Sequence, residues 1–416
     1  MVKEKLTLKD YVLSLGPGAI MAANIIGPGT VTSASVSGSK FGYQAMWLVM
    51  LSCFMAYFYQ ELGTRLSLSK GVNIYTAFRV TMGKKTSEFL WFVIYFGSIA
   101  FLAGNISGSN MALTYIFQGT NYLMWSVVVL LIAFAIAWIN RYGVVEKINE
   151  VLVVLMVIAF FATAIACKPN VGDIFSTGFS FKIPGNDYWS ATALLATTAV
   201  PNLIFGYTAF MATKYPHCEN LDRQIKLSNF GLGFNMVVTF LITAAIVICS
   251  GAVLYPRGVE VKSAGDMAQQ LAPLLGNFAG ILFAFGLFGA AISSTLFHFT
   301  AHPRMFPAAF GLDENPAAFH NRAVTIPLVL LPFIFIVIWG STPVSVLMTA
   351  QAVNGIAMPI VFFFCWRLGR NKEYMGKYAN KTWQNVIFVA MTLLSLLFAV
   401  NTFRSLILKI IAMAAA

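Results

Sequence analysis

Two short polar interruptions fall inside long apolar stretches of the chain, and they hold the residues best placed to do chemistry. The first is Gly27-Pro28-Gly29-Thr30, and the second is Thr197-Thr198-Ala199-Val200-Pro201-Asn202. Each proline removes a backbone donor, and the glycines permit unusual dihedral angles, so the pattern predicts a helix break at each place. Simple proline kinks are the alternative. Two breaks at corresponding places in two halves of a chain favour a binding site between them.

The elements that must carry these breaks are membrane-spanning helices. Of the 416 residues, 58% are hydrophobic and 10% are charged, against about 25% charged in a typical soluble domain. Mean hydropathy is +0.76. This composition excludes a soluble enzyme, a nucleic-acid-binding protein and a disordered chain, and it predicts an all-α polytopic protein embedded in a lipid bilayer. Apolar runs of spanning length predict about eleven helices. The runs lie near 11–38, 44–66, 88–118, 123–140, 150–167, 188–214, 230–255, 277–302, 323–340, 343–368 and 384–412.

The loops between these runs predict an orientation. With the N-terminus inside, 20 of the 27 Lys and Arg residues fall on the cytoplasmic side and 7 fall outside. Cytoplasmic loops carry the excess of basic residues, so we expect a cytoplasmic N-terminus and an external C-terminus. We expect a multi-pass plasma-membrane protein, in a bacterial inner membrane, as a monomer or weak homodimer. The five cysteines show no ligand spacing and are expected to be reduced packing residues.

The spacing of the breaks predicts internal symmetry. They fall in the first and sixth predicted helices, five helices apart, as in transporters built from a 5+5 inverted repeat of the LeuT-like kind. Helices 1–5 (residues 1–170) and helices 6–10 (residues 171–370) would form the repeats. Residues 371–416 would add a loop and an eleventh helix.

At these motifs the sequence resembles the NRAMP family of divalent-metal transporters. The stretch from Gly27 to Gly71 is similar to the family's first two helices. The family's Asp-Pro-Gly-Asn falls on Gly27-Pro28-Gly29-Thr30, and its Met-Pro-His falls on Val200-Pro201-Asn202. Ser293-Ser294-Thr295 resembles a polar triplet of the eighth helix, and Gln351 falls on a tenth-helix glutamine. The resemblance covers most of the chain.

The departures from the family pattern bear on the substrate. In the family, the aspartate, asparagine and methionine coordinate a transition metal, whereas here Gly27, Thr30 and Val200 stand in their places. The acidic residues of the family's third helix have no equivalent, because that helix reads LAGNISGSNMAL and carries Asn105 instead. These losses resemble the NRAMP-related magnesium transporters.

The remaining ligands are neutral oxygens. They are the Thr30 hydroxyl, the Asn202 and Gln351 amides, and backbone carbonyls near Gly27 and Thr197. Hard oxygens suit Mg²⁺, Ca²⁺ and Mn²⁺, and Mg²⁺ keeps several of its waters. Val200 in place of methionine leaves room for those waters. We therefore predict import of hydrated Mg²⁺ at millimolar affinity, with Mn²⁺ as a further candidate substrate and with no bound cofactor.

Proton coupling is not expected, because the membrane potential alone supplies about 4.6 kcal/mol per 100 mV for a dication. Candidate residues for coupling or for an ion pathway are Glu61, Asn105, Tyr207 and His298. Glu61 has Arg65 four residues later, so a structural ion pair is the stronger interpretation. Helix-bridging polar contacts are the default for Tyr207, and a packing role is the default for His298.

Three alternatives stay open at this point. A proton-coupled transition-metal transporter of the NRAMP type keeps the fold and changes the ion. A transporter of a small organic solute would use the half-helix ends for a charged group. A non-transporting sensor is least favoured, since the chain has no segment that reads as a signalling domain. No nucleophile–base pair or phosphate-binding motif suggests an enzyme.

Overall fold

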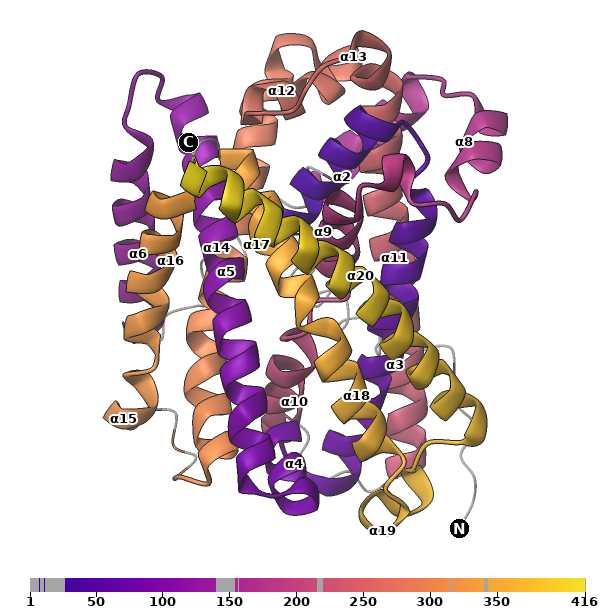
Figure 1. Cartoon of the computed structure of the whole chain (residues 1–416), viewed down its shortest axis with the longest axis vertical. Coiled ribbons are helices and arrows are strands. Elements are labelled where there is room, and N and C mark those ends of the chain that lie inside the picture. The colour runs from indigo at the N-terminus through magenta and orange to yellow at the C-terminus, as the bar shows by residue number, and fades with distance from the viewer. Residues whose placement is uncertain are drawn as a thin grey trace.

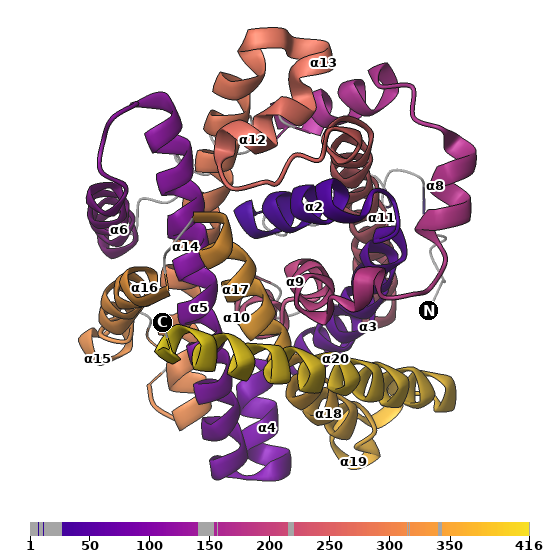
Figure 2. The same ribbon diagram turned by 45° about the horizontal axis from the view of Figure 1, so that its top comes forward.

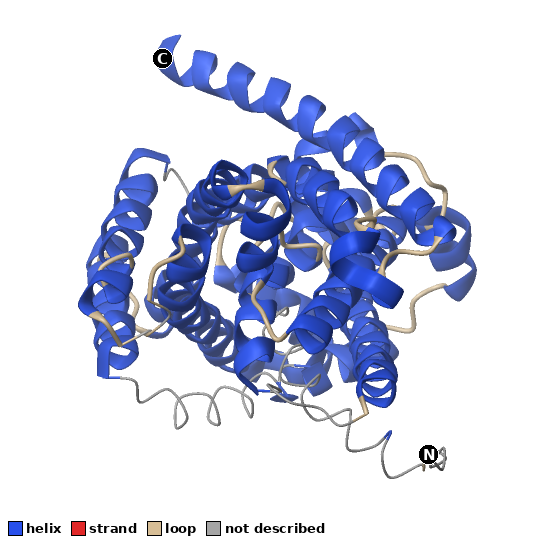
Figure 3. Ribbon diagram, turned by 90° about the horizontal axis from the view of Figure 1, so that it is seen from below, coloured by secondary structure: helices blue, strands red, loops and turns tan. Residues whose placement is uncertain are grey.

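The computed structural model describes residues 7, 11, 27–139, 154–155, 157–214, 220–313, 315, 317–339 and 343–415. Within these residues every regular element is a helix (Figure 3). Six helical segments of the described chain are long and apolar enough to cross a membrane, and a seventh is a pair, Val157–Ala166 and Val171–Gly178, bent by 110°. The expected all-α membrane architecture is confirmed.

Long helices make the frame of the bundle. They are α3 (Met46–Lys70), α5 (Lys84–Ile116), α11 (Leu221–Val253), α14 (Ala279–Phe310) and α20 (Thr382–Ala415). Shorter helices complete it. They are α2 (Pro28–Phe41), α4 (Ile74–Met82), α6 (Tyr122–Ile139), α8 (Val171–Gly178), α9 (Tyr188–Thr198), α10 (Leu203–Lys214), α15 (Phe319–Arg322), α16 (Thr325–Trp339), α17 (Pro343–Ile356), α18 (Met358–Gly369) and α19 (Lys372–Met375).

The helices divide into a core and an outer ring. α2, α9 and α17 lie near the middle of the bundle, while α6 and α16 form its outer edge and α20 crosses its surface (Figures 1 and 2). The outer helices expose large apolar side chains, such as Leu131 on α6, Leu330 on α16 and Leu393 on α20. These faces suit lipid, which explains why the chain can leave so much apolar surface uncovered.

The break predicted in the sixth helix is confirmed. α9 ends at Thr198, a turn covers residues 199–202, and α10 begins at Leu203. In the first predicted helix, α2 begins at Pro28 with Gly27 as its N-cap, and proline suits this position because its missing N–H would be unpaired in any case. The half of that helix before Gly27 lies outside the described residues.

The helix ends differ from the hydropathy prediction. α11 begins at Leu221 rather than near residue 230, and α14 runs to Phe310 with Pro303 and Pro307 inside it. The tenth predicted span is interrupted at Ala357, between α17 and α18. Six short helices lie outside the predicted runs, namely α4, α8, α12 (Ala264–Ala268), α13 (Ala272–Leu275), α15 and α19. The division of the chain into repeats at residues 170 and 370 stays a prediction.

Glycines on α5 let the core helices approach closely. A Cβ on Gly108 would lie 2.6 Å from Cβ of Pro28, and one on Gly104 would lie 3.1 Å from Cβ of Ala350. α5 therefore packs closely against both the start of α2 and the middle of α17. Of the cysteines, four lie in the described part of the chain and are free, as expected.

Asp187 fixes the start of α9 and ties it to the end of α2. Its carboxylate accepts from the amide (3.0 Å) and the hydroxyl (2.8 Å) of Ser190 and forms an ion pair with Lys40. Burial alone would raise the pKa of Asp187, but the bonds from Lys40 and Ser190 outweigh it and hold the pKa below the usual 3.8.

Replacing Asp187 with alanine is expected to lower the free energy of unfolding by about 1 kcal/mol, because an N-cap is lost. Asp187→Asn keeps the cap acceptor and removes only the charge. Because the folded pKa is depressed, the charge stabilises the fold above the unfolded pKa and stops doing so as pH falls through the folded value. The gap between wild type and Asp187→Asn in thermal unfolding should therefore close below pH 3.8. A gap that is unchanged by acid would contradict this assignment.

Candidate cation site

The first predicted break places the start of α2 deep inside the bundle. Gly27 and Thr30 are buried, and the Gly27 carbonyl accepts the Val31 amide at 3.2 Å. That oxygen is therefore part of the first helical turn and keeps one lone pair for another partner. A Cβ on Gly27 would lie 3.0 Å from Oγ of Ser294 on α14. Glycine thus allows α14 to approach the break.

Pro201 and a hydrogen bond from α3 stabilise the second break. Pro201 has no N–H, so the Thr197 carbonyl lacks its usual helical donor. The Tyr59 hydroxyl on α3 donates to the Val200 carbonyl at 2.8 Å. The Thr197 hydroxyl bonds the Leu194 carbonyl of its own helix at 2.8 Å. The hydroxyl of Thr197 is therefore engaged, and the ligand role of its carbonyl stays a prediction.

Asn202 lies at the end of this turn and contacts α5 and α14. Its Nδ2 is 2.7 Å from Nε2 of His298 and 3.3 Å from Oγ of Ser98. Nδ1 of His298 lies 2.8 Å from the Ser294 carbonyl. With the Asn202 amide nitrogen facing Nε2, Nδ1–H donates to the Ser294 carbonyl and Nε2 accepts from Asn202, which is the arrangement of a neutral imidazole. His298 is thus a buried, hydrogen-bonded residue whose partner is Asn202 at the break.

Gln351 on α17 lies directly against the backbone of the first break. A Cβ on Gly29 would come within 2.0 Å of Nε2 and 2.7 Å of Cδ of Gln351. The glutamine is fully buried, and neither of its amide atoms has a hydrogen-bond partner among the described residues. A buried amide without partners is costly, at about 1–3 kcal/mol. The Gln351 amide therefore remains available to a polar ligand at the break.

The structure brings most of the predicted ligand residues into one region. Gln351 touches Gly29, two residues after Gly27, and Ser294 lies beside both Gly27 and the His298–Asn202 pair. α2 also packs on α9, α14 and α17. The region therefore joins the start of α2, the α9–α10 turn, α14 and α17, with α5 behind them.

Three other candidates lie elsewhere or lack a defined role. Glu61 forms the expected ion pair with Arg65, with Oε1 2.7 Å from Nε. The Tyr207 hydroxyl lies 3.0 Å from Oγ1 of Thr64 and so bridges α10 to α3. Asn105 is fully buried on α5, and neither of its amide atoms has a partner in the described part of the chain. Their proposed roles in an ion pathway stay predictions.

Two neighbours of the site were not singled out by the sequence. Ser98 is a lone serine in an apolar helix, and no local pattern marks it. Ser294 was noted only within a family-like triplet, yet it lies beside Gly27 at the first break, and its carbonyl binds His298, the partner of Asn202 at the second. The described residues contain no group of three or more His, Cys, Asp or Glu side chains that could hold a metal ion. The region therefore offers neutral oxygens and one neutral imidazole.

A helical membrane bundle with a buried polar region between two helix breaks is typical of membrane transport proteins. The sequence matches the natural resistance-associated macrophage protein-like (Nramp) family over residues 18–405. The chain belongs to the Nramp family, whose members are transporters and not enzymes, and the expected LeuT-like helical fold is confirmed.

Curated relatives share a quarter of their residues with this chain. It is 25% identical to the divalent metal cation transporter MntH of Caldanaerobacter subterraneus subsp. tengcongensis, over 92% of this chain and 90% of that protein. It is 25% identical to MntH of Bacillus subtilis, over 94% and 92% respectively. A homolog of natural resistance-associated macrophage protein 2 from Dictyostelium discoideum is 24% identical over 91% of this chain and 61% of the relative.

Solved structures show the same fold. The manganese transporter of Eremococcus coleocola, in complex with an aromatic bis-isothiourea compound, superposes with a TM-score of 0.80 at 17% identity, covering 97% of this chain and 89% of the other. A nucleobase-cation-symport-1 family transporter with bromovinylhydantoin bound gives a TM-score of 0.65 at 12% identity, covering 94% and 92%. At these identities the likeness extends to the fold alone.

Proposed function

We propose that this Nramp transporter carries a divalent cation across the plasma membrane by alternating access, and that its substrate is hydrated Mg²⁺. The relatives named above are divalent metal cation transporters, which supports the general substrate class. Mg²⁺ as the particular ion is argued from the residues of this chain. Mn²⁺ is the second ion to test, because it also accepts oxygen ligands.

The observation that carries the proposal is the partnerless amide of Gln351 against the first break. An amide oxygen is a hard, neutral ligand, and so are the Thr30 hydroxyl and the Thr197 carbonyl. With no carboxylate at Gly27 and no thioether at Val200, a bare dication would be poorly compensated. Mg²⁺ dehydrates reluctantly and keeps several waters, so it suits a region whose ligands are uncharged. Low affinity follows, in the millimolar range in order of magnitude.

The membrane potential can drive this import unaided. A dication gains about 4.6 kcal/mol per 100 mV, which corresponds to roughly a thousandfold accumulation. Because the potential is negative inside the cell, it sets the direction of cation movement as inward.

A proton-coupled transition-metal transporter is the second candidate, and one contact favours it. His298 holds Asn202 at the second break, and an imidazole nitrogen is a good ligand for transition metals once it is released from that bond. This candidate predicts that Mn²⁺ is preferred over Mg²⁺ and that protons enter with the metal.

Ion uptake into proteoliposomes tests the two candidates together. A negative-inside potential is imposed, and internal Mg²⁺, Mn²⁺ and pH are recorded with dyes. We expect saturable Mg²⁺ entry without acidification, and we expect Gln351→Ala and Asn202→Ala to raise the KM for Mg²⁺ about tenfold. Asn235→Ala is the matched control, since it removes a buried amide from α11, which carries none of the predicted ligands, and its KM should stay at the wild-type value.

The outcomes separate the candidates. Mn²⁺ entry with acidification, at the expense of Mg²⁺, would replace the magnesium proposal with the proton-coupled one. Failure of both ions to enter would overturn divalent-cation transport and direct attention to small organic solutes.

A further inference from the structure

Asn202, at the second break, is held through the nitrogen of its side-chain amide. Nδ2 lies 2.7 Å from Nε2 of His298 on α14 and 3.3 Å from Oγ of Ser98 on α5. An amide nitrogen carries two hydrogens, so these two acceptors use both of them. Neither bond involves Oδ1, the amide oxygen, which is the atom through which an asparagine binds a hard cation.

The direction of the Asn202 amide depends on the ring of His298. Nδ1 lies 2.8 Å from the Ser294 carbonyl, and a carbonyl only accepts, so Nδ1 carries the hydrogen of a neutral ring. The other nitrogen, Nε2, is then bare and accepts a hydrogen bond. A bare nitrogen pairs with the amide nitrogen of Asn202 and repels the amide oxygen. The Ser294 carbonyl therefore determines, through His298, which end of the amide is turned away from α14.

The surroundings of His298 favour the neutral ring. The side chain is buried, and the ring of Phe101 stacks on it with 5.1 Å between ring centres. Phe297 meets it edge-on at 5.6 Å, and His302 lies 6.2 Å away. A buried imidazolium needs a counter-ion, and no carboxylate is among the described contacts of His298.

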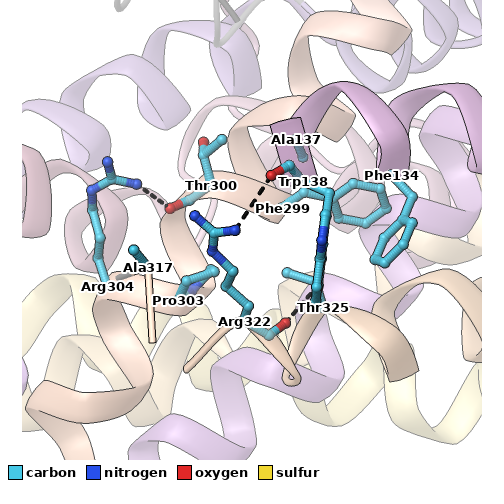
Figure 4. A pocket seen from close by; sticks show the side chains of 10 residues that line it. All are labelled: Phe134, Ala137, Trp138, Phe299, Thr300, Pro303, Arg304, Ala317, Arg322 and Thr325. Carbon is cyan, nitrogen blue, oxygen red and sulfur yellow. Dashed lines mark hydrogen bonds between the residues drawn. The ribbon is translucent and has the colours of Figure 1, made fainter. Parts of the chain in front are cut away.

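The two sides of α14 carry different residues. Ser294 and His298 are one helical turn apart and lie on the side toward the two breaks. Phe299, Thr300 and Pro303 lie on the other side, where they line a separate pocket against α6 and the start of α16 (Figure 4). Helix periodicity therefore places His298 toward the break.

Ser98 supports the arrangement of the Asn202 amide without deciding it. A hydroxyl both donates and accepts, so Ser98 can bond either end of the amide. A ring nitrogen that is fixed as an acceptor has no such freedom. Of the two partners of Asn202, His298 is therefore the one that distinguishes the amide nitrogen from the amide oxygen.

We propose that His298 is a positioning residue that turns the amide oxygen of Asn202 toward the transported cation, and that the Ser294 carbonyl fixes the ring for this role. The inference rests on the proposed function, in which Asn202 is a ligand. Without His298 the amide could rotate and present its N–H groups, which repel a cation and suit a carboxylate. His298 thereby favours a cation over an anionic organic solute at this break.

Uptake kinetics of the full chain in proteoliposomes test this role. His298→Leu removes the acceptor, so it should raise the KM for Mg²⁺ about fivefold, the worth of one hydrogen bond, with little change in the maximal rate. His298→Gln can accept from Asn202 through its amide oxygen and donate to Ser294 through its nitrogen. It should recover most of the lost affinity, whereas a role in packing alone predicts no such recovery.

The double variant Asn202→Ala/His298→Leu shows whether the histidine acts through Asn202. Its KM should equal that of Asn202→Ala, because His298 would have no amide left to orient. His302→Leu is the matched control, since it removes a second buried histidine one turn further along α14. Its KM should stay at the wild-type value.

Nitrogen NMR of the purified full chain, labelled at histidine, reads the ring without any transport and also serves if His298→Leu does not fold. We expect one histidine with a protonated Nδ1 and a bare, hydrogen-bonded Nε2 at neutral pH. This signal should be missing from His298→Gln and present in His302→Leu.

Four results would overturn the inference. A protonated Nε2 on His298 would mean that the amide oxygen of Asn202 faces the ring. A wild-type KM in His298→Leu would show that the amide keeps its direction without the histidine. Independent, fully additive effects of His298→Leu and Asn202→Ala on KM would show that the histidine does not act through Asn202. A wild-type KM in Asn202→Ala would overturn the proposed ligand set itself, and this inference with it.

Discussion

Replacing Arg65 with methionine is expected to lower the free energy of unfolding by about 3–5 kcal/mol, because it leaves the buried Glu61 carboxylate without its cation. Both side chains are nearly inaccessible, at 7% and 8% exposure. Nη2 of Arg65 donates to Glu61 Oε2 at 2.8 Å and to Asn380 Oδ1 at 2.9 Å, and Nη1 donates to the Tyr378 carbonyl. One arginine therefore joins α3 to the segment that precedes α20. Thermal unfolding in detergent measures the loss.

The double variant Glu61→Gln/Arg65→Met is the control for this prediction. It removes both charges, so it should be more stable than Arg65→Met alone even though it has lost one more native group. Asn229 and Gln384 also approach Glu61, at 3.3 Å and 3.4 Å, and they can bond the neutral amide of the double variant. A single variant that loses less than about 1 kcal/mol would indicate that water already reaches the pair.

Gly29→Ala is expected to reduce cation uptake strongly with little effect on stability. The new Cβ would occupy the present position of the Gln351 amide, 2.0 Å from Nε2. The end of a flexible side chain can move aside, so the fold should survive, but the ligand would leave its place. Losing the contact of the Gln351 amide with the ion corresponds to about a tenfold rise in KM, as for Gln351→Ala. Uptake kinetics and thermal unfolding, measured together, distinguish displacement from unfolding.

Gly233→Ala is the matched control, because among the described residues its Cβ would meet only Cε2 of Tyr57, at an ordinary 3.6 Å. It should transport as wild type does. Combining Gly29→Ala with Gln351→Ala removes the clash but also the ligand, so its uptake should equal that of Gln351→Ala. Normal uptake by Gly29→Ala would show that the Gln351 amide does not contact the ion.

Much of the fold could be predicted because the bilayer imposes a simple rule on the sequence. A span must be apolar over its length, and a proline within it leaves a carbonyl without a donor, so Pro201 marked the second break correctly. Hydropathy fails at helix ends, because hydrogen bonding continues after the apolar run stops. α11 therefore begins at Leu221, among charged residues. The interruption at Ala357 was missed because nothing in the local pattern distinguishes it from an ordinary kink before Pro359.

The site was predicted only in part, and the reason is the direction of side chains. Asn202 and Gln351 were chosen because they match positions in a family motif beside the breaks, and the structure places both at the breaks. Ser98 contacts Asn202 across 104 residues of sequence, a pairing that depends on how α5 packs against the α9–α10 turn. No periodicity within either segment encodes it.

The lengths of the helices determine how the protein responds to the thickness of the membrane. α2, α9 and α10 contain 14, 11 and 12 residues, or roughly 17–21 Å at 1.5 Å per residue, which is less than the ~30 Å hydrocarbon core. α5 and α11 contain 33 residues each, or about 50 Å, and must tilt or extend beyond that core. A thicker or thinner bilayer therefore acts on the tilt of the long helices, while the short helices that carry the proposed cation ligands are enclosed by them and are spared the mismatch.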